Sequence, residues 1–194
     1  QGFGEELWEA GFGEFGRKMQ TDLSDGVKAL ADQGTIDPKR VCIVGASYGG
    51  YAALAGVTLQ TGIYRCAISD AGLSDLPAMM AWIQNNEYYQ ENGAVQYWGR
   101  YMAADDPYSP ALKDISPIFH IDNVNVPILL THGTDDTVVQ LGQSERMVDA
   151  LQKAGKTVEF VKMQDEDHWL SRSETRLQML QADIDFLMKY NPPD

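Results

Sequence analysis

Cysteine and basic residues are scarce in this chain. It has 194 residues with two cysteines, and its 15 lysines and arginines face 28 aspartates and glutamates, a net charge of −13. Nucleic acids and anionic membranes bind proteins through basic patches. The only adjacent basic pairs are Arg17-Lys18 and Lys39-Arg40. We therefore expect neither a nucleic-acid partner nor a membrane partner.

The two cysteines, Cys42 and Cys66, are too few for a disulfide framework. Both lie in apolar, strand-like runs, which favours buried free thiols. No apolar run approaches the roughly 18–20 residues that span a bilayer, and the N-terminus shows no signal peptide. Because the chain starts at Gln1 rather than Met, we expect Gln1 to be a cut rather than a natural start.

Strand and helix patterns alternate along most of the chain. The first apolar run, residues 41–45, lacks alternation, so we expect it to be covered on both faces. Residues 70–120 are aromatic-rich and interrupted by prolines, which indicates short helices that form a cap. The alternation predicts an α/β fold with a mostly parallel sheet and helices on both faces. The strands are expected at 41–45, 66–69, 127–132 and 157–163, and the longer helices at 21–33, 48–59, 144–153 and 171–190.

Residues 45–50 carry a G-x-S-x-G pattern between the first strand and the following helix. In this context small residues at Gly45 and Gly49 let strand and helix pass closely, and the sharp turn lifts the Ser47 hydroxyl clear of the sheet. The helix N-terminus makes the backbone N–H of Tyr48 a candidate oxyanion-hole donor. The alternative is a glycine-rich turn with a serine that takes no part in chemistry.

A serine hydroxyl needs a base and an orienting acid to act as a nucleophile. Of the three histidines, His120 fits half-buried packing, and His132 fits a structural role that bonds the turn after the third strand. The expected order on this fold is serine, acid, histidine. Only His168 leaves room for an acid-bearing strand after Ser47, so His168 is the candidate base.

The acid should follow a strand that lies between nucleophile and base. Asp135 and Asp136 directly follow the third strand, and the residues alone do not choose between them. Asp70 and Asp75, after the second strand, are weaker candidates.

The sequence offers no convincing metal or cofactor site. It has no H-E-x-x-H motif and no cysteine pair at ligand spacing, and the 45–50 turn lacks the lysine of a phosphate-binding loop. We expect no cofactor. Next to His168, we expect Asp165, Glu166 and Asp167 to be solvated loop charges, with binding of a substrate ammonium group as the alternative.

Longer motifs resemble the prolyl oligopeptidase (S9) family of serine peptidases over nearly the whole chain. The first of these motifs is an aromatic- and glycine-rich segment that leads into an Asp-containing helix at 13–23, and the second is G-x-S-Y-G-G-Y at 45–51. Around the third strand the motifs are S-P at 116–117 and a V-P strand ending in H-G at 126–133. After it come D-x-x-V at 136–139, Q-S at 143–144 and an acidic loop with histidine at 165–168. The residues directly after His168 depart from the family's common glycine-rich continuation and resemble the acylaminoacyl-peptidase and dipeptidyl-peptidase-like branches.

The resemblance implies an α/β-hydrolase fold and a choice of acid. In the family the acid lies four residues after the strand-end histidine and three before the valine, which from His132 and Val139 selects Asp136. The implied site is a Ser47–His168–Asp136 triad that hydrolyses short peptides through an acyl-enzyme. The alternatives are a carboxylesterase of the same fold and a catalytically inactive fragment that acts as an assembly module.

The resemblance also implies an apolar substrate pocket. Leu73 and Leu76 follow the second strand where the family forms this pocket, with Tyr48 and Val139 as possible further walls. The alternative is that the leucines belong to the ordinary core.

Two parts of the family are missing from the sequence, namely the N-terminal β-propeller and the first hydrolase strands, which supply the second oxyanion donor. We therefore expect residues 1–194 to be a single fragment, the C-terminal part of the catalytic domain. The first strand would then have a bare edge, and such edges recruit partners. We expect a homo-oligomer or association with the missing N-terminal portion. The family includes cytosolic and secreted members, so the compartment stays open.

Overall fold

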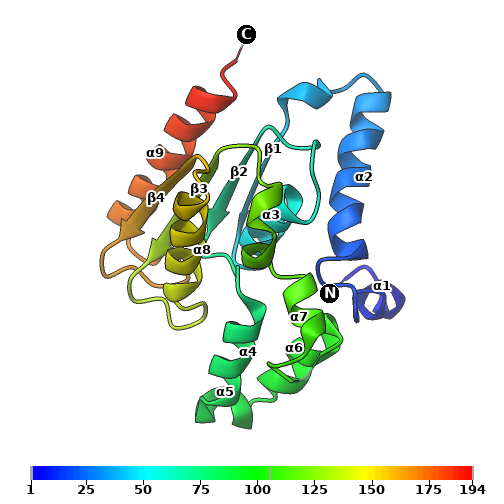
Figure 1. Ribbon diagram of the computed structural model, residues 1–194, viewed down its shortest axis with the longest axis vertical. Coiled ribbons are helices and arrows are strands. Elements are labelled where there is room, and N and C mark those ends of the chain that lie inside the picture. Colours follow the sequence, from blue (N-terminus) through cyan, green and yellow to red (C-terminus); the bar gives the residue numbers. More distant parts are fainter. Residues whose placement is uncertain (1, 105, 194) are drawn as a thin grey trace.

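The computed structural model describes residues 2–104 and 106–193. The predicted strands and longer helices are confirmed, and each lies within a few residues of its expected place (Figure 1). In chain order the elements are α1 (Glu5–Glu9), α2 (Lys18–Asp32), η1 (Pro38–Arg40), β1 (Cys42–Ala46), α3 (Tyr48–Thr58), β2 (Cys66–Asp70), α4 (Leu76–Gln84), α5 (Glu87–Glu91), α6 (Ala94–Met102), α7 (Pro110–Asp114), η2 (Pro117–Asn123), β3 (Ile128–Gly133), α8 (Gly142–Lys153), β4 (Val158–Met163) and α9 (Ser173–Tyr190).

The four described strands form one parallel sheet in the order β1-β2-β3-β4. All four carboxyl ends therefore lie at the same edge of the sheet. Residues that follow the strands are brought together there, as is usual for functional residues in open α/β sheets.

Helices cover both faces of the sheet, as predicted. Helices α3 and α8 pack on one face, where Ile128 and Leu130 of β3 meet Leu54 and Met147. Helix α9 packs on the other face, where the intervening Leu129 belongs to a separate apolar cluster. This alternation along β3 is the period-2 pattern of a strand buried on both sides. Figure 1 shows α9 on the opposite side of the sheet from α3 and α8.

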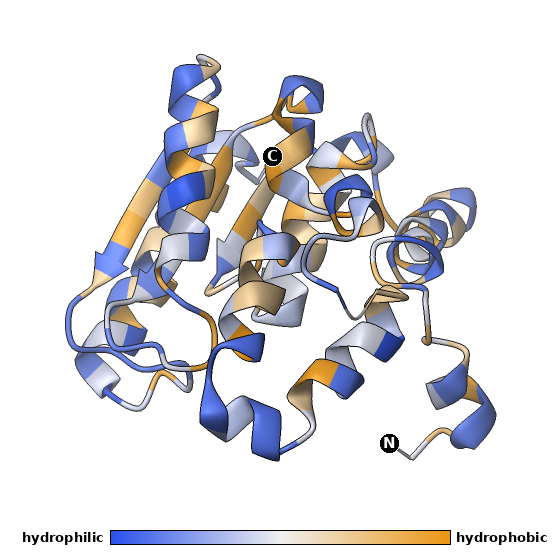
Figure 2. Cartoon of the chain, turned by 60° about the horizontal axis from the view of Figure 1, so that its bottom comes forward, coloured by the Kyte–Doolittle hydropathy of each residue, from blue (hydrophilic) through white to orange (hydrophobic). Residues whose placement is uncertain are grey.

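The short helices α4 to α7 extend from one end of the sheet, as the aromatic-rich region predicts (Figure 1). Together with residues of α3 such as Tyr51, they enclose an apolar cluster that includes Leu76, Met80 and Met102. Prolines begin two of these helices rather than only interrupting them, because Pro77 and Pro110 lie in the first turns of α4 and α7. A proline in that position lacks only an N–H that has no partner within the helix. Figure 2 shows apolar segments in the interior of the fold and hydrophilic segments on the outer helices and loops.

Strand β1 is more exposed than the sequence suggested. The prediction that it is covered on both faces is wrong, because Val44 is 49% exposed and Ala46 is also exposed. Helix α3 packs on one face of β1, whereas α9 packs mainly on β2, β3 and β4. Within the described residues β1 ends the sheet, so the predicted bare edge is confirmed.

The prediction of free cysteines is also wrong. Cys42 and Cys66 form a disulfide bond. They are opposite each other in the β1–β2 register, with their Cα atoms 4.7 Å apart, a separation that a disulfide can bridge. Each run on its own looked like a buried apolar strand. Only the pairing of the two strands brings the sulfur atoms together.

The disulfide should contribute measurably to stability. It joins residues 24 positions apart, and closing a loop of this size restricts the unfolded chain by an amount worth about 3 kcal/mol. We expect reductant to lower the free energy of unfolding by about that amount in chemical denaturation. The double variant Cys42→Ala/Cys66→Ala should be less stable than the oxidised protein and insensitive to reductant. Identical unfolding curves of the unaltered protein with and without reductant would contradict a stabilising effect of the disulfide.

Candidate active site

Ser47 lies on a tight turn between β1 and α3. Its φ is 58°, a left-handed conformation that is uncommon for a residue with a side chain, and its backbone N–H donates to the carbonyl of Asp70 at 2.8 Å. A Cβ added to Gly45 would lie 2.4 Å from the backbone of Gly49. Strand and helix therefore cross at a distance that only glycine allows, and the turn between them holds the serine.

The three predicted catalytic residues come together at the carboxyl edge of the sheet. The Ser47 Oγ lies 3.0 Å from Nε2 of His168, and Nδ1 of His168 lies 2.7 Å from Oδ2 of Asp136. Each residue follows a different strand, β1, β3 or β4. The arrangement can pass a proton from the hydroxyl to the imidazole while the carboxylate orients the ring.

The Asp136 carboxylate is buried and fully hydrogen-bonded. Its Oδ1 accepts the backbone N–H groups of Val138 and Val139, each at 2.8 Å. Its Oδ2 lies 3.3 Å from Nε2 of His132 in addition to its contact with His168. Burial alone would raise the pKa of Asp136, but hydrogen bonds from the two imidazoles and the two amides more than offset it. The pKa lies well below its usual range, so the group is ionised at neutral pH.

The other aspartates considered as the acid have different surroundings. Asp135 is exposed and contributes a backbone N–H to the carbonyl of Glu166. Asp70 accepts the Thr131 hydroxyl at 2.6 Å. Asp75 accepts the first-turn N–H of Ala78 and so caps α4. Asp136, by contrast, contacts two imidazoles.

The acidic loop before His168 is built into the structure. The prediction of a solvated charge is wrong for Glu166, which is fully buried. Its carboxylate accepts the N–H groups of Asp167 and Arg172 and the Thr175 hydroxyl, and these contacts tie the loop to the start of α9. The Asp167 carboxylate forms a turn with the residues that follow it, because it accepts the backbone N–H of Trp169 and the hydroxyl of Ser171. Only Asp165 is exposed as predicted.

The remaining histidines hold neighbouring segments through hydrogen bonds. His120 is half-buried, as expected, and lies 3.0 Å from the carbonyl of Asp114. His132 is fully buried and bonds the segment after β3, which confirms its structural assignment. Its contact with Asp136 was not foreseen. The signal in the sequence was the four-residue spacing between His132 and Asp136, since a chain that bends back after a strand can bring two such residues together.

The leucines predicted to line the substrate pocket lie in the core. Leu73, Leu76 and Val139 are at most 2% exposed and belong to the cluster under the short helices. None of them lines the apolar cavity beside the nucleophile turn. That cavity has a volume of about 200 Å³ and is lined by Phe15, Met19, Tyr48, Tyr97, Trp98 and Tyr101. Of the walls named from the sequence, Tyr48 lines this cavity. Sequence reasoning missed its other five residues, although aromatic residues concentrate at 12–15 and 97–101.

Tyr48 is the first residue of α3. The first N–H groups of a helix have no partner within that helix, so the N–H next to Ser47 is not used within α3. The ring of Tyr48 packs on Phe15 at 5.0 Å between centroids. Burial raises the pKa of its phenol to about 12, so the ring stays neutral beside the serine.

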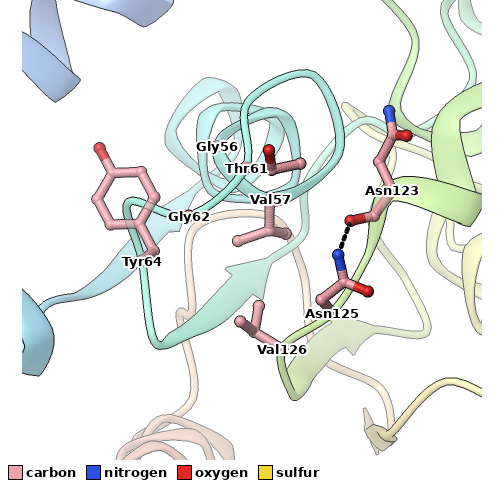
Figure 3. Close-up of a pocket in the computed structure, with 8 residues that line it drawn as sticks. All are labelled: Gly56, Val57, Thr61, Gly62, Tyr64, Asn123, Asn125 and Val126. Carbon is pink, nitrogen blue, oxygen red and sulfur yellow. Dashed lines mark hydrogen bonds between the residues drawn. The ribbon is translucent and has the colours of Figure 1, made fainter.

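A second, smaller cavity lies away from the site. Figure 3 shows it between the end of α3 and the segment before β3, with the Asn125 amide donating to the carbonyl of Asn123 at 2.9 Å. Its volume of about 20 Å³ has room for a water molecule but not for a substrate. It is lined by Gly56, Val57, Thr61, Gly62, Tyr64, Asn123, Asn125 and Val126.

Two kinds of feature are absent from the part of the chain that the structure describes. No group of three or more histidine, cysteine or acidic residues is arranged to hold a metal ion. No helix there is long and apolar enough to cross a membrane.

Comparison with known proteins decides the family. Residues 1–192 match the profile of the prolyl oligopeptidase family. The chain belongs to this family. Dipeptidyl aminopeptidase BIII of Pseudoxanthomonas mexicana is 31% identical over 182 residues, which cover 89% of this chain and 25% of that protein. The chain thus spans about a quarter of the length of the curated relatives it matches.

Solved structures agree on the fold. A puromycin-hydrolyzing peptidase of Mycobacterium tuberculosis superposes with a TM-score of 0.85 at 28% identity, covering 96% of this chain and 27% of that one. An acylaminoacyl peptidase of Pyrococcus horikoshii superposes with a TM-score of 0.87 at 22% identity, covering 100% of this chain and 31% of that one. The predicted α/β-hydrolase fold is confirmed.

Proposed function

We propose that this protein is a serine peptidase that uses Ser47, His168 and Asp136 as its catalytic triad. The observation that carries the proposal is the continuous hydrogen-bonded path of 3.0 Å and 2.7 Å from hydroxyl to imidazole to carboxylate. Membership in a family of peptidases supports the same interpretation.

The proposed reaction is acyl transfer to water. His168 takes the proton of Ser47 as the oxygen attacks the peptide carbonyl, and then gives this proton to the leaving amine. Water attacks the acyl-enzyme with His168 as base again. Asp136 holds the imidazole in the tautomer that presents an unprotonated Nε2 to the serine, and it stabilises the imidazolium. The low pKa of Asp136 keeps it ionised throughout this cycle.

The oxyanion that forms in each step needs donors aimed at it. The N–H of Tyr48 is the donor we assign from these residues. The resemblance to the family implies a second donor from the first hydrolase strands.

The aromatic cavity that Tyr48 lines is the proposed substrate pocket. Tyr48 connects this pocket to the nucleophile, since it follows Ser47 in the chain and also lines the cavity. Apolar, aromatic walls accept an apolar side chain and reject a charged one, because a charge would lose its hydration there. We therefore propose short peptides with a large apolar residue near the scissile bond as substrates.

A carboxylesterase is the alternative, because the same triad attacks esters and amides. The relatives' names favour peptides. Rates on a peptide anilide and on a short acyl ester with the same acyl group, measured on the full-length protein, separate the two. A preference for the peptide anilide supports the peptidase, and activity confined to the ester would overturn it.

A fluorophosphonate probe should label the protein at Ser47. Ser47→Ala should abolish labelling, and His168→Gln should slow it by about 10³-fold or more because the base is lost. Intact-protein and peptide mass spectrometry give the extent and position of labelling. Ser24→Ala, remote from the site, serves as the matched control and should label normally. Labelling that persists in Ser47→Ala, or none in the native protein, would contradict an active nucleophile and support the inactive-fragment alternative.

The cavity assignment predicts a change in substrate preference. In the full-length protein, Trp98→Ala removes one wall and should lower kcat/KM for a bulky aromatic substrate by about 10–100-fold. A substrate with a small residue in the same place should be affected much less. Tyr88→Ala is the control, because Tyr88 is exposed and lies outside the cavity. Equal losses on both substrates would argue against this pocket.

We further propose that the open edge of β1 is covered in the working enzyme, either by the further part of the longer protein or by a second copy. The edge has no partner strand among the described residues, and Val44 on the adjoining face is 49% exposed. Unpaired strand edges with apolar side chains favour such association.

The 194-residue chain on its own should therefore self-associate in multi-angle light scattering. Val44→Lys should shift it toward monomer, because a charge on the edge strand opposes pairing. Leu7→Lys, at an exposed position of α1, is the matched control and should not change the mass. If the unaltered 194-residue chain is monomeric across the concentration range, the expected self-association is contradicted.

A further inference from the structure

His132 occupies a fully buried position at the end of β3. Its Nδ1 lies 2.8 Å from Oγ of Ser144, on α8. Its Nε2 lies 2.9 Å from the carbonyl oxygen of Val139 and 3.3 Å from Oδ2 of Asp136. Both ring nitrogens are therefore engaged, and Nε2 also reaches the candidate catalytic acid.

These partners determine the tautomer of His132. A backbone carbonyl and a carboxylate only accept hydrogen bonds, so Nε2 must carry the proton that they share. Nδ1 then accepts from the Ser144 hydroxyl, and a neutral imidazole satisfies every contact.

One oxygen of Asp136 thus meets two imidazoles. Oδ2 accepts from Nδ1 of His168 at 2.7 Å and lies 3.3 Å from Nε2 of His132, whose shorter contact is to the Val139 carbonyl at 2.9 Å, while Oδ1 is occupied by two backbone amides. The negative charge that faces His168 is reduced by each additional donor to the same carboxylate.

We propose that His132 is a positioning residue that acts through Asp136. By placing its Nε2–H between the Val139 carbonyl and Oδ2, it holds this oxygen toward His168 and shares part of the carboxylate charge that would otherwise face the His168 ring. The contact between His132 and Asp136 is observed whatever the function, but the role in catalysis proposed for it rests on the proposed function.

Other ionisable groups around the cluster stay unchanged in the test. The Tyr89 phenol on α5 and the Asp167 carboxylate interact electrostatically with Asp136. Beyond Ser144 on α8, Arg146 pairs with Asp75 at 3.2 Å. Since none of these is altered, a shift in His168 reports the loss of the His132 donor.

The test is an NMR titration of the imidazoles in the 194-residue chain, which has only three histidines. In His132→Leu the two backbone amides still hold Oδ1, so the Asp136 carboxylate stays in place. Its Oδ2 loses the contact with His132, so more of the negative charge faces His168. We expect the titration midpoint of His168 to rise by about 0.5–1 pH unit. His132→Gln, which keeps an N–H donor, should show less than half of that rise.

Two further variants keep the result interpretable. Thr58→Val removes a buried hydroxyl on α3 that donates to the carbonyl of Leu54 and is remote from Asp136. Like His132→Leu it removes a buried polar group, but it should not move the His168 midpoint. Ser144→Ala removes only the donor to Nδ1 and leaves the Nε2–H with its two acceptors, so it should move the midpoint much less than His132→Leu does. If His132→Leu does not fold, His132→Ala is measured in its place.

An unchanged His168 midpoint in the folded His132→Leu or His132→Ala protein overturns the proposal, as does an equal shift in Thr58→Val. In the active full-length enzyme the acid limb of kcat/KM should move upward with the midpoint, and rescue by His132→Gln should restore it. Absence of Ser47 labelling would count against the proposed function but would leave the titration readable, so the two failures are distinguishable.

Discussion

The close crossing of β1 and α3 is the constraint on which the rest of the site depends. At this crossing a side chain on Gly45 would collide with the backbone of Gly49, and one on Gly50 would lie 2.7 Å from Cα of Gly72. The second contact ties the start of α3 to the segment after β2. Ser47 is held in its left-handed conformation by this packing, because the chain has no room to relax. The hydroxyl is therefore positioned by backbone geometry before any side-chain partner is considered.

Helix α8 connects the loops that follow β2 and β3. Gln143 is fully buried, and its Oε1 accepts the N–H groups of Ser74 and Asp75 at 2.9 and 2.8 Å. The next residue, Ser144, contacts His132. Two consecutive polar residues at the start of one helix thus hold the loop after β2 and the support of Asp136. This gives the Q-S pair in the sequence a physical reason.

Much of this arrangement could be predicted because its signals are local. The turn around Ser47 is specified within six residues, and the strand runs are short and apolar. Order along the chain selected His168, whereas the choice of Asp136 over Asp135 needed the resemblance to a family. Neighbouring aspartates differ only in which of them turns inward, and this depends on the backbone bend that brings Val138 and Val139 to Oδ1.

The features that escaped prediction depend on contacts between distant segments. The pairing of Cys42 with Cys66 follows from strand register, and the burial of Glu166 follows from α9 packing over the loop. Exposure of Val44 depends on which strands α9 reaches. A pattern within one segment carries no information about these partners.

The Cys42–Cys66 bond makes residues 42–66 a covalently closed ring. This ring contains Ser47 and the whole of α3, and it is closed at the end of the strands opposite to the nucleophile. A protease that cuts once within residues 59–65, between α3 and β2, would open the ring but could not release either piece. The nicked protein would migrate as one chain without reductant and as two with it. The segment that carries the nucleophile would then stay attached to the next strand even after its backbone had been cut.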